Sequence, residues 1–307
     1  MVEFKQLFIK IKGMIVHLLI QETMGYGVLI SLYEKLQKEG WVQKIHICHD
    51  VKGLDIQNDM IIPMDVSANK TLFSQSAMQD IYFDMLDDKI DFYDYLSWNN
   101  HLLGKIKLIP CYDTTYNGRN IVKNFMIKDR KGFGSLKNKI KRDSIYSLIY
   151  NYTPQNQIQD LLNVKQTIAV DGFCRNGEIQ SLFYSIQKGG LTFKDYKNTG
   201  FSMEYSTTFE NQDMEIFIQG LLEQIHYTGF FQFEFVLNEL DEMFILECNP
   251  RISGHVFTKN YYKYVILPFL TKDFGKILER GMDHFPPFWT EIPKLLGTIF
   301  CKLLNCF

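Results

Sequence analysis

The chain has 307 residues, of which 46% are hydrophobic and 15% aromatic. This composition indicates a globular protein and excludes an intrinsically disordered chain, and the length allows two or three compact units. The formal net charge of −2 neither favours nor disfavours a nucleic-acid partner.

The six cysteines are scattered and form no C-x-x-C pair, which predicts reduced thiols and a cytoplasmic location. No apolar run approaches the roughly 18 residues of a spanning helix, so we expect no transmembrane segment. Residues 1–13 contain three lysines, make a poor secretory signal and are expected to form an N-terminal extension.

The first part of the chain predicts a small parallel α/β layer. Apolar runs predict strands at 14–20, 45–48 and 59–62, and a helical pattern at 28–38 ends at Gly40. Strands that alternate with helices are typical of a parallel sheet.

Two short motifs in this layer each allow two interpretations. Gly25 and Gly27 form a G-x-G, which belongs either to a tight strand-to-helix turn or to an incomplete dinucleotide-binding pattern. The second motif is a strand end rich in metal-ligand residue types. Because no partner cluster lies at a zinc spacing, these residues are either incidental or part of a metal site. They are His46, Cys48, His49 and Asp50.

Residues 77–100 predict a helix that is dense in acidic and aromatic residues. Lys89 lies within it, in a D-K-x-x-F sequence. One interpretation is a solvated lysine that pairs with a nearby aspartate. The other is a lysine that contacts a ligand.

A second lysine, Lys128, ends a short apolar strand and precedes a glycine turn. The glycines would let backbone amides approach an anion closely, and a serine adds a hydroxyl. Residues 128–142 also carry seven basic residues against one acid, so a nucleic-acid patch is the competing interpretation, although aromatic residues are few there. The turn residues are Gly132, Gly134 and Ser135.

Further elements are predicted before the last hairpin. Residues 157–162 favour a strand, and residues 167–173 and 178–183 favour a hairpin around a turn at 175–177. Residues 213–226 predict a helix.

The hairpin that follows combines apolar strands with polar residues. A strand at 229–237 is joined by a four-residue turn, 238–241, to a second strand that runs into a carboxylate. We expect Leu237 to pair with Glu242 across this turn.

This register predicts a cluster of oxygen atoms. It places Gln232 opposite Glu247 and makes Glu234 a diagonal neighbour of Glu247, so alternation puts both acids on one face. Asn249 follows on the same face. Two carboxylates and an amide oxygen form a site of the kind that magnesium takes with nucleotide phosphates, and Arg251 adds a planar fork for phosphate or carboxylate. The alternative is an ordinary amphipathic hairpin, but an acid on a buried strand is costly without a partner.

These motifs resemble, in the same order, those of the ATP-grasp superfamily, of the carboxylate–amine ligase or carbamoyl-phosphate-synthase-like type. That family's hairpin ends roughly in E-x-N-x-R, which here is Glu247, Asn249 and Arg251. The resemblance covers about residues 80–260. It implies a chain of the α/β and α+β classes with an ATP-grasp fold, in which two lobes clamp ATP.

The resemblance also implies a division into domains. A short Rossmann-like, pre-ATP-grasp domain would span residues 14–85. The ATP-grasp domain would span residues 86–307, with a hinge near 157–162. Apolar residues from Leu295 to Phe307 predict a C-terminal amphipathic helix, which either packs on the core or docks on a partner or a membrane surface.

Specific roles follow from the resemblance. The metal ligands would be Glu234, Glu247 and Asn249. The nucleotide-binding residues would be Lys89, Lys128, Gly132, Gly134, Ser135, Asp160, Leu161 and Leu162, with Arg251 and Lys128 as catalytic residues. Asp160 would lie near the ribose, but Gln166 and Thr167 stand where the family often has a further acid. His255 would either touch the acceptor or cap the structure.

The implied activity is that of an ATP-dependent carboxylate–amine ligase that forms a C–N bond through an acylphosphate. Its cofactors would be ATP and Mg²⁺, with Mn²⁺ as a substitute. Its partners would be a small-molecule carboxylate and amine, with no nucleic acid, and self-association into a homo-oligomer is left open. The short glycine turn and the missing acid motivate an alternative, a nucleotide-binding pseudoenzyme or scaffold. A small-molecule kinase of the same fold is another.

Overall fold

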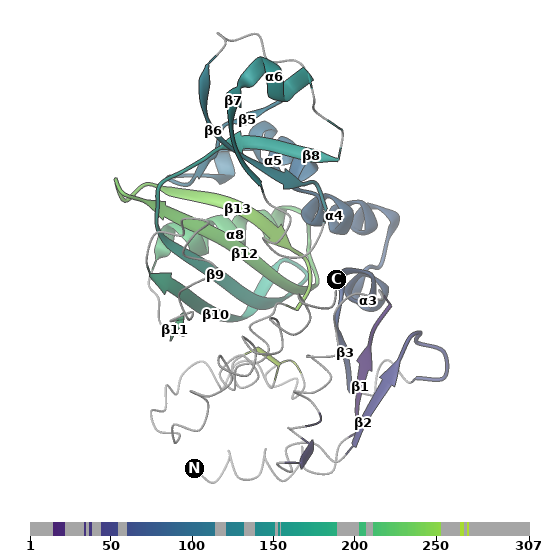
Figure 1. The fold of residues 1–307 in the computed structure, drawn as a ribbon. Helices are drawn as coiled ribbons and strands as arrows, with labels where there is room; N and C mark the ends of the chain where they lie inside the picture. Colours follow the sequence, from purple (N-terminus) through teal and green to yellow (C-terminus); the bar gives the residue numbers. More distant parts are fainter. Residues whose placement is uncertain are drawn as a thin grey trace.

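The computed structural model describes most of the middle of the chain and short pieces nearer its ends (Figure 1). Within this part, the strands form three sheets, of three, six and four strands. The described residues are 15–21, 34, 37–38, 44–54, 60–113, 121–131, 139–150, 153, 155–188, 203–206, 211–252, 265–266 and 269.

The smallest sheet has the order β2-β1-β3, and its strands pair in parallel. The strands expected from the alternating pattern are therefore confirmed, as is their parallel direction. They are β1 (Ile15–Leu19), β2 (Lys44–Cys48) and β3 (Met60–Pro63). Most of the helix expected at 28–38 lies outside the described residues, as does the G-x-G motif at residues 25–27.

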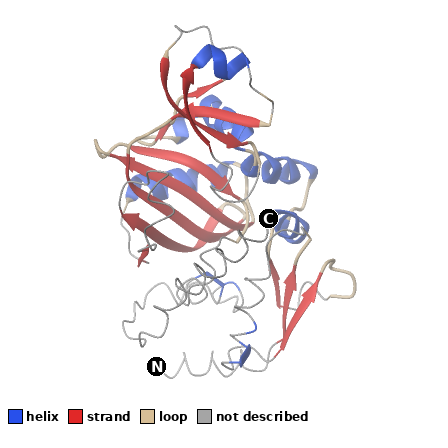
Figure 2. Ribbon diagram, viewed as in Figure 1, coloured by secondary structure: helices blue, strands red, loops and turns tan. Residues whose placement is uncertain are grey.

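The largest sheet has the order β11-β10-β9-β12-β13-β4, and helices cover one of its faces (Figure 2). Its pairs are antiparallel apart from β13 with β4. The strands are β4 (Lys107–Leu108), β9 (Val164–Arg175), β10 (Glu178–Lys188), β11 (Met203–Ser206), β12 (Gly229–Asn238) and β13 (Met243–Asn249).

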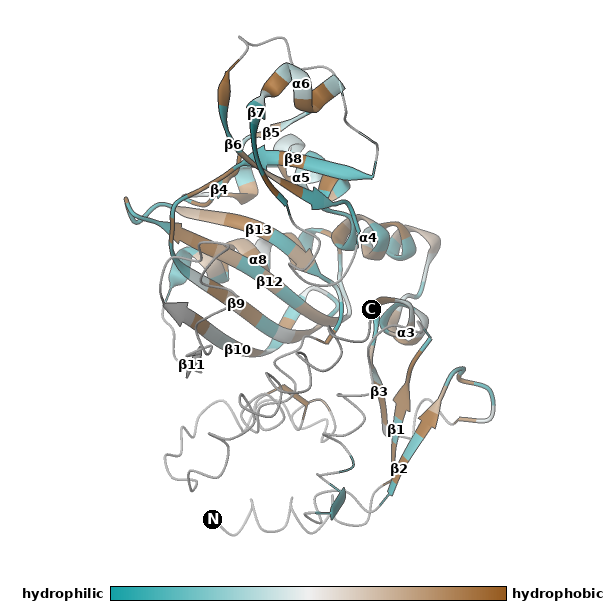
Figure 3. Ribbon diagram, in the orientation of Figure 1, coloured by the Kyte–Doolittle hydropathy of each residue, from teal (hydrophilic) through white to brown (hydrophobic). Residues whose placement is uncertain are grey.

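The covered face of this sheet forms the main core. In β12, Phe231, Phe233 and Phe235 are fully buried in that core, and alternation turns Gln232 and Glu234 to the other face. Burial of each ring stabilises the fold by about 1.5–3 kcal/mol relative to exposure. Figure 3 shows the resulting change between hydrophobic and hydrophilic residues along the strands. The helices in this core are α4 (Ala77–Asp87), α5 (Lys89–Trp98) and α8 (Gln212–Gln224).

The β9–β10 hairpin confirms the predicted hairpin at 167–183. Asn176 and Gly177 have φ of 49° and 84°, the left-handed values that a two-residue hairpin turn of type I′ requires. Further along β9, Gly172 lies opposite Phe231, and a Cβ there would be 2.3 Å from the backbone oxygen of Ser181. Glycine therefore lets the three strands approach closely at this point.

The region from 77 to 100 differs from the single helix that its pattern predicted. It forms α4, α5 and a short 3₁₀ turn, η1 (Asn100–Leu102), with a break at Asp88. Asp88 is extended, with φ −100° and ψ 114°, and its side chain accepts hydrogen bonds from the backbone N–H groups of Ile90 and Asp91. The prediction was wrong because an aspartate within the pattern begins a new helix as its N-cap. Lys89 is consequently the first residue of α5.

The four-stranded sheet has the order β5-β8-β6-β7 and lies beside the large sheet (Figure 1). One of its faces is covered by α6 (Ile145–Tyr150), whose Leu148 packs with Phe125 and Ile158 in a small core. Its strands are β5 (Cys111–Tyr112), β6 (Val122–Asp129), β7 (Lys139–Ser144) and β8 (Asn156–Asp160).

α3 (Val66–Phe73) follows β3 and connects the small sheet to α4. The predicted domain boundary between residues 85 and 86 falls within α4, and the C-terminal amphipathic helix expected from the sequence lies outside the described residues. No helix in the described part of the chain is long and apolar enough to cross a membrane.

Candidate active site

The β12–β13 hairpin brings two carboxylates together. Glu234 lies directly opposite Glu247, and Gln232 lies opposite Asn249, so that all four residues are on one face of the sheet. The prediction that both acids share a face is therefore confirmed. This face is the one turned away from the phenylalanine core.

The register that led to this prediction was wrong in detail. Leu237 pairs with Met243 rather than Glu242, and a bulge beside Glu234 shifts the pairing again. The loop is closed by the Asn238 side chain, whose Oδ1 accepts hydrogen bonds from two backbone N–H groups, and Asp241 is left-handed with φ 57°. A three-residue loop with a left-handed last residue replaces the expected four-residue turn. As a result, the acids are directly opposite rather than diagonal.

Lys89 reaches this face from α5. Its Nζ lies 3.5 Å from Oε2 of Glu247. The helix is attached to β13 by Tyr93, whose hydroxyl donates a 2.6 Å hydrogen bond to the backbone oxygen of Ile245. The backbone N–H of Lys89 donates a 3.1 Å hydrogen bond to the carbonyl oxygen of Arg130. The first turn of α5 is thus held between the large sheet and the end of β6.

Lys128 approaches the same acids from β6. The residue is only 6% exposed, and burial lowers the pKa of its ammonium group, as does the charge of Lys89. The carboxylates of Glu247 and Glu234 act in the opposite direction and raise this pKa. Two lysines from separate elements therefore share one electrostatic environment with two glutamates.

The electrostatics of Glu247 reflect this environment. Burial raises its pKa, but Lys89 and Lys128 outweigh that effect, with help from an Asn249 hydrogen bond and from Arg251. The net result is a pKa below the usual value, so Glu247 is ionised at neutral pH. An ionised carboxylate is the form that a divalent cation requires.

Asn249 and Arg251 extend the cluster beyond the end of β13. The Asn249 amide donates hydrogen bonds to Oε1 of Gln232 (3.2 Å) and Oε1 of Glu247 (3.3 Å). Its Oδ1 accepts a 2.8 Å hydrogen bond from the Arg251 guanidinium and retains a second lone pair. These bonds orient the carboxamide oxygen and Arg251 relative to the two acids.

Oxygen donors on this face fit a magnesium ion. This donor set contains only two acids, with an amide oxygen as the third donor. No group of three or more His, Cys, Asp or Glu in the described residues is arranged to hold a metal. The protein donors here would be Glu234, Glu247 and Asn249. Mg²⁺ commonly takes one or two carboxylates and completes its octahedral shell with waters and substrate phosphates, so this donor set suits it.

Asp160 does not share the face of Lys128. It pairs with Phe125, whereas Lys128 pairs with Gln157, so alternation turns the Asp160 carboxylate to the α6 side of the sheet. There it lies 2.5 Å from the Lys123 ammonium and accepts a 2.9 Å hydrogen bond from the Tyr112 hydroxyl. Its expected role near a ribose remains a prediction. Leu161 and Leu162 follow directly after β8, and their backbone role is likewise a prediction.

Two glutamines that sequence reasoning did not assign lie on the Lys128 face of the same sheet. Gln157 and Gln159 alternate with Ile158 along β8, and both are almost fully buried. Among the described residues, neither Oε1 atom has a hydrogen-bond partner. Buried oxygens without a partner are costly, so their presence here suggests a surface arranged for a polar ligand. The signal in the sequence was the alternation in N-Q-I-Q-D.

A buried acid on the large sheet was also missed. Asp171 of β9 is fully buried and pairs with Gln232, which in turn pairs with Asn249. The three side chains form a polar row next to the row that contains Glu234 and Glu247. An aspartate inside the apolar run 168–173 was the available signal.

Several predicted residues are outside the described part of the chain. These are Gly132, Gly134, Ser135 and His255. Of the metal-like motif near residue 46, His46 Nδ1 lies 3.1 Å from Nδ1 of His17, and His49 Nδ1 lies 2.8 Å from the carbonyl oxygen of Ile20. This motif does not meet the candidate site residues through any contact within the described residues.

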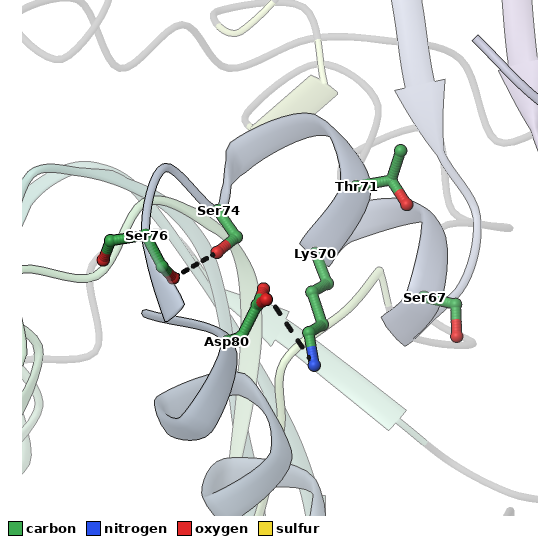
Figure 4. A pocket seen from close by; sticks show the side chains of 6 residues that line it. All are labelled: Ser67, Lys70, Thr71, Ser74, Ser76 and Asp80. Atoms are coloured by element: carbon green, nitrogen blue, oxygen red, sulfur yellow. Dashed lines mark hydrogen bonds and ion pairs between the residues drawn. The ribbon is translucent and has the colours of Figure 1, made fainter. Parts of the chain in front are cut away.

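A separate polar pocket of about 650 Å³ lies between α3 and α4 (Figure 4). Its Lys70 ammonium lies 3.0 Å from Asp84 and 4.0 Å from Asp80. Because these acids balance the lysine, the pocket offers a phosphate group no net positive charge. Its lining residues are Ser67, Lys70, Thr71, Ser74, Ser76 and Asp80.

The sequence matches no protein-family model and no curated protein. Its structure is similar to the L-amino acid ligase from Bacillus licheniformis, with a TM-score of 0.53, 10% identity, and coverage of 86% of this chain and 74% of that one. It is also similar to N5-carboxyaminoimidazole synthetase from Staphylococcus aureus (TM-score 0.49, 11% identity, coverage 88% and 78%). The D-alanine–D-alanine ligase from Bacillus anthracis gives a TM-score of 0.49 at 8% identity, with coverage of 87% and 95%.

At these identities the comparison establishes the fold alone. The chain has the ATP-grasp fold that the ordered motifs predicted. The Rossmann-like character of the N-terminal layer stays a prediction.

Proposed function

We propose that this chain is an ATP-dependent ligase that activates a carboxylate as an acylphosphate and joins it to an amine. The observation that carries the proposal is the meeting of Lys89 and Lys128 with Glu234 and Glu247 on one sheet face of an ATP-grasp fold. Lysines suit phosphate oxygens and paired acids suit a divalent cation, so the same cluster suits both the phosphate groups and the metal ion of MgATP.

Each residue has a role in this proposal. Lys89 and Lys128 neutralise phosphate oxygens of ATP. Glu234, Glu247 and Asn249 would hold Mg²⁺, or Mn²⁺ in its place, and the bound ion would supply neutralisation of phosphate charge. Arg251 orients the acyl carboxylate or the transferring phosphoryl group through its planar fork.

The reaction has two steps. In the first, a carboxylate oxygen of the acyl substrate attacks the γ-phosphorus, the bond to the leaving oxygen of ADP breaks, and an acylphosphate forms. In the second, the amine attacks the acyl carbon, the bond to phosphate breaks, and the amine loses a proton as inorganic phosphate leaves. The chain contributes mainly positioning and charge neutralisation, since phosphoryl transfer needs little covalent help from a protein.

The nucleobase would occupy the Lys128 face of the four-stranded sheet. Gln157 and Gln159 present buried oxygens on that face, and the backbone at Leu161 and Leu162 follows it. The glycines at 132 and 134, which lie outside the described residues, would contribute backbone amides to the phosphates. Because the L-amino acid ligase shares the fold, amino acids are the first carboxylates and amines to test.

The decisive experiment combines binding with product analysis. The melting temperature of the purified chain is measured with and without MgATP. Separate samples are incubated with MgATP and pooled carboxylates and amines, and phosphate release and product masses are measured. We expect MgATP to raise the melting temperature, and phosphate to appear when both a carboxylate and an amine are present. Glu247→Gln should abolish both effects, whereas Glu239→Gln, in the exposed hairpin loop, should abolish neither.

Other outcomes select another function. A phosphorylated product without an amine would indicate a small-molecule kinase. A rise in melting temperature without phosphate release from any pool would indicate a nucleotide-binding scaffold. An unchanged melting temperature at saturating MgATP would contradict all three.

A further inference from the structure

A single buried side chain connects α3 to the end of the candidate metal hairpin. Asn69 is fully buried, and its amide nitrogen lies 2.7 Å from the carbonyl oxygen of Pro250 and 2.9 Å from that of Phe230. Its Oδ1 accepts a 3.2 Å hydrogen bond from the backbone N–H of Phe230. One carboxamide thus bridges the start of β12 and the residue that follows β13.

The orientation of this carboxamide is determined by its partners. Two carbonyl oxygens can only accept, so they must face the amide nitrogen, and a backbone N–H must face the oxygen. The hydroxyl of Tyr227 also lies 3.1 Å from the amide nitrogen and donates a 2.6 Å hydrogen bond to the Phe230 oxygen. The network is therefore saturated, and no rotamer of a shorter side chain would reproduce it.

The backbone around Asn69 is shaped to receive it. Gly229 has φ 146°, and a Cβ at this position would lie 3.0 Å from both polar atoms of the Asn69 carboxamide. Glycine lets the start of β12 approach the helix closely. Figure 1 shows α3 beside this end of the large sheet.

The contact with Pro250 bears on the candidate site. Pro250 lies between Asn249 and Arg251, and the backbone N–H of Arg251 donates a 2.8 Å hydrogen bond to the carbonyl oxygen of Asn249. The Arg251 guanidinium in turn binds Oδ1 of Asn249. A displacement of the Pro250 carbonyl would therefore move both side chains relative to Glu247.

We propose that Asn69 is a positioning residue that holds the Asn249–Arg251 turn in the geometry required for metal and phosphate binding. It touches neither ligand and acts through the backbone of Pro250. The proposal rests on the proposed function and goes beyond it, because it makes the metal site depend on a residue of the N-terminal layer.

The test uses the full chain with Asn69→Ala, the isosteric Asn69→Asp and the control Tyr184→Phe. The control removes a buried hydroxyl whose hydrogen bond to Glu215 joins β10 to α8, away from the hairpin end. Two quantities are measured. One is the Mg²⁺ concentration that gives half of the ATP-dependent rise in melting temperature, and the other is amide hydrogen exchange of residues 245–252 without ligands.

We expect both Asn69 variants to raise the half-saturating Mg²⁺ concentration about 10-fold, the lower end of the effect of supporting residues at metal sites. They should also accelerate exchange in 245–252, and the control should do neither. Asn69→Asp keeps the acceptor for Phe230 and the volume of the side chain, so it removes the two bonds to the carbonyls without the cavity that Asn69→Ala leaves.

Control-like values in a folded Asn69 variant would overturn the proposal. If the unaltered chain shows no response to MgATP, the proposed function fails by itself. Exchange in 245–252 then still decides whether Asn69 holds the turn.

Discussion

Asp88 and Arg130 form an ion pair, with 2.5 Å between the carboxylate Oδ2 and the guanidinium Nε, that joins the N-cap of α5 to the residue after β6. Lys89 follows Asp88 directly, and Lys128 lies two residues before Arg130. The pair therefore fixes the two candidate phosphate-binding lysines relative to one another, although neither Asp88 nor Arg130 belongs to the candidate site.

Substitution of Asp88 should separate its two structural roles. Asp88→Ala removes the helix cap, at a cost of about 1 kcal/mol, and a charge-assisted hydrogen bond, at a cost of about 1.5–3 kcal/mol. Asp88→Asn retains the cap and loses only the charge, so it should be less damaging. The free energy of unfolding in urea measures both. Equal losses in the two variants would show that the cap contributes nothing.

Glu247 should make stability depend on pH. Its folded pKa lies below the unfolded value of about 4.3, mainly because Lys89 and Lys128 outweigh the effect of burial. The ionised side chain therefore stabilises the fold above about pH 4.3, and this contribution is lost as the pH falls through the folded pKa. We expect Glu247→Gln to lower the free energy of unfolding at neutral pH, and the difference from the unaltered chain to shrink on acidification. Urea titrations from neutral to acidic pH, with Glu239→Gln as control, measure this difference in the free energy of unfolding. A difference that stays constant with pH would contradict the expectation.

The Gln159 side chain should lower the free energy of unfolding and strengthen nucleotide binding. Its buried Oε1 has no hydrogen-bond partner among the described residues, a situation that costs about 1–3 kcal/mol. Gln159→Leu should therefore raise the free energy of unfolding by roughly 1 kcal/mol or more. The same variant should weaken nucleotide binding in a titration that follows the melting temperature. Gln155→Leu, at an exposed position, is the control. A lower free energy of unfolding for Gln159→Leu would mean that the Gln159 side chain has hydrogen-bond partners in the folded protein.

Two glycines should respond to alanine in opposite directions. At Gly172 an added Cβ would lie 2.3 Å from a backbone oxygen, so Gly172→Ala should destabilise the fold by about 1–3 kcal/mol or more. At Gly220, within α8, the nearest atom would be a methyl carbon of Leu102 at 3.6 Å. Gly220→Ala should stabilise the fold by up to about 1 kcal/mol through helix propensity. The measurement is the melting temperature of each variant. We expect a lower value than that of the unaltered chain for Gly172→Ala and a higher one for Gly220→Ala, and shifts of both in the same direction would contradict the prediction.

Much of the fold could be predicted because its signals are local. The alternation in 229–237 depends only on the two-residue period of a strand, so it correctly put Gln232 and Glu234 on the face away from the phenylalanines. Glu247 shares that face because the register is shifted by one residue at the loop and by another at the bulge, and the two shifts compensate. The turn at Asn176 and Gly177 was predicted for the same reason, since its left-handed backbone depends on those residues alone. The N-cap role of Asp88 was also encoded locally, but the surrounding helical pattern concealed it.

Local patterns specified which faces of the strands are apolar, the order of the motifs and, through that order, the ATP-grasp fold. Three features required the folded chain: the hairpin register, the side of the sheet that Asp160 occupies, and the contact of Asn69 with the carbonyl of Pro250. These features depend on a bulge, on strand pairing and on packing between segments as far as 181 residues apart. Local periodicity specifies which side of an element is apolar, but the partner on that side is chosen by the packing of the whole chain.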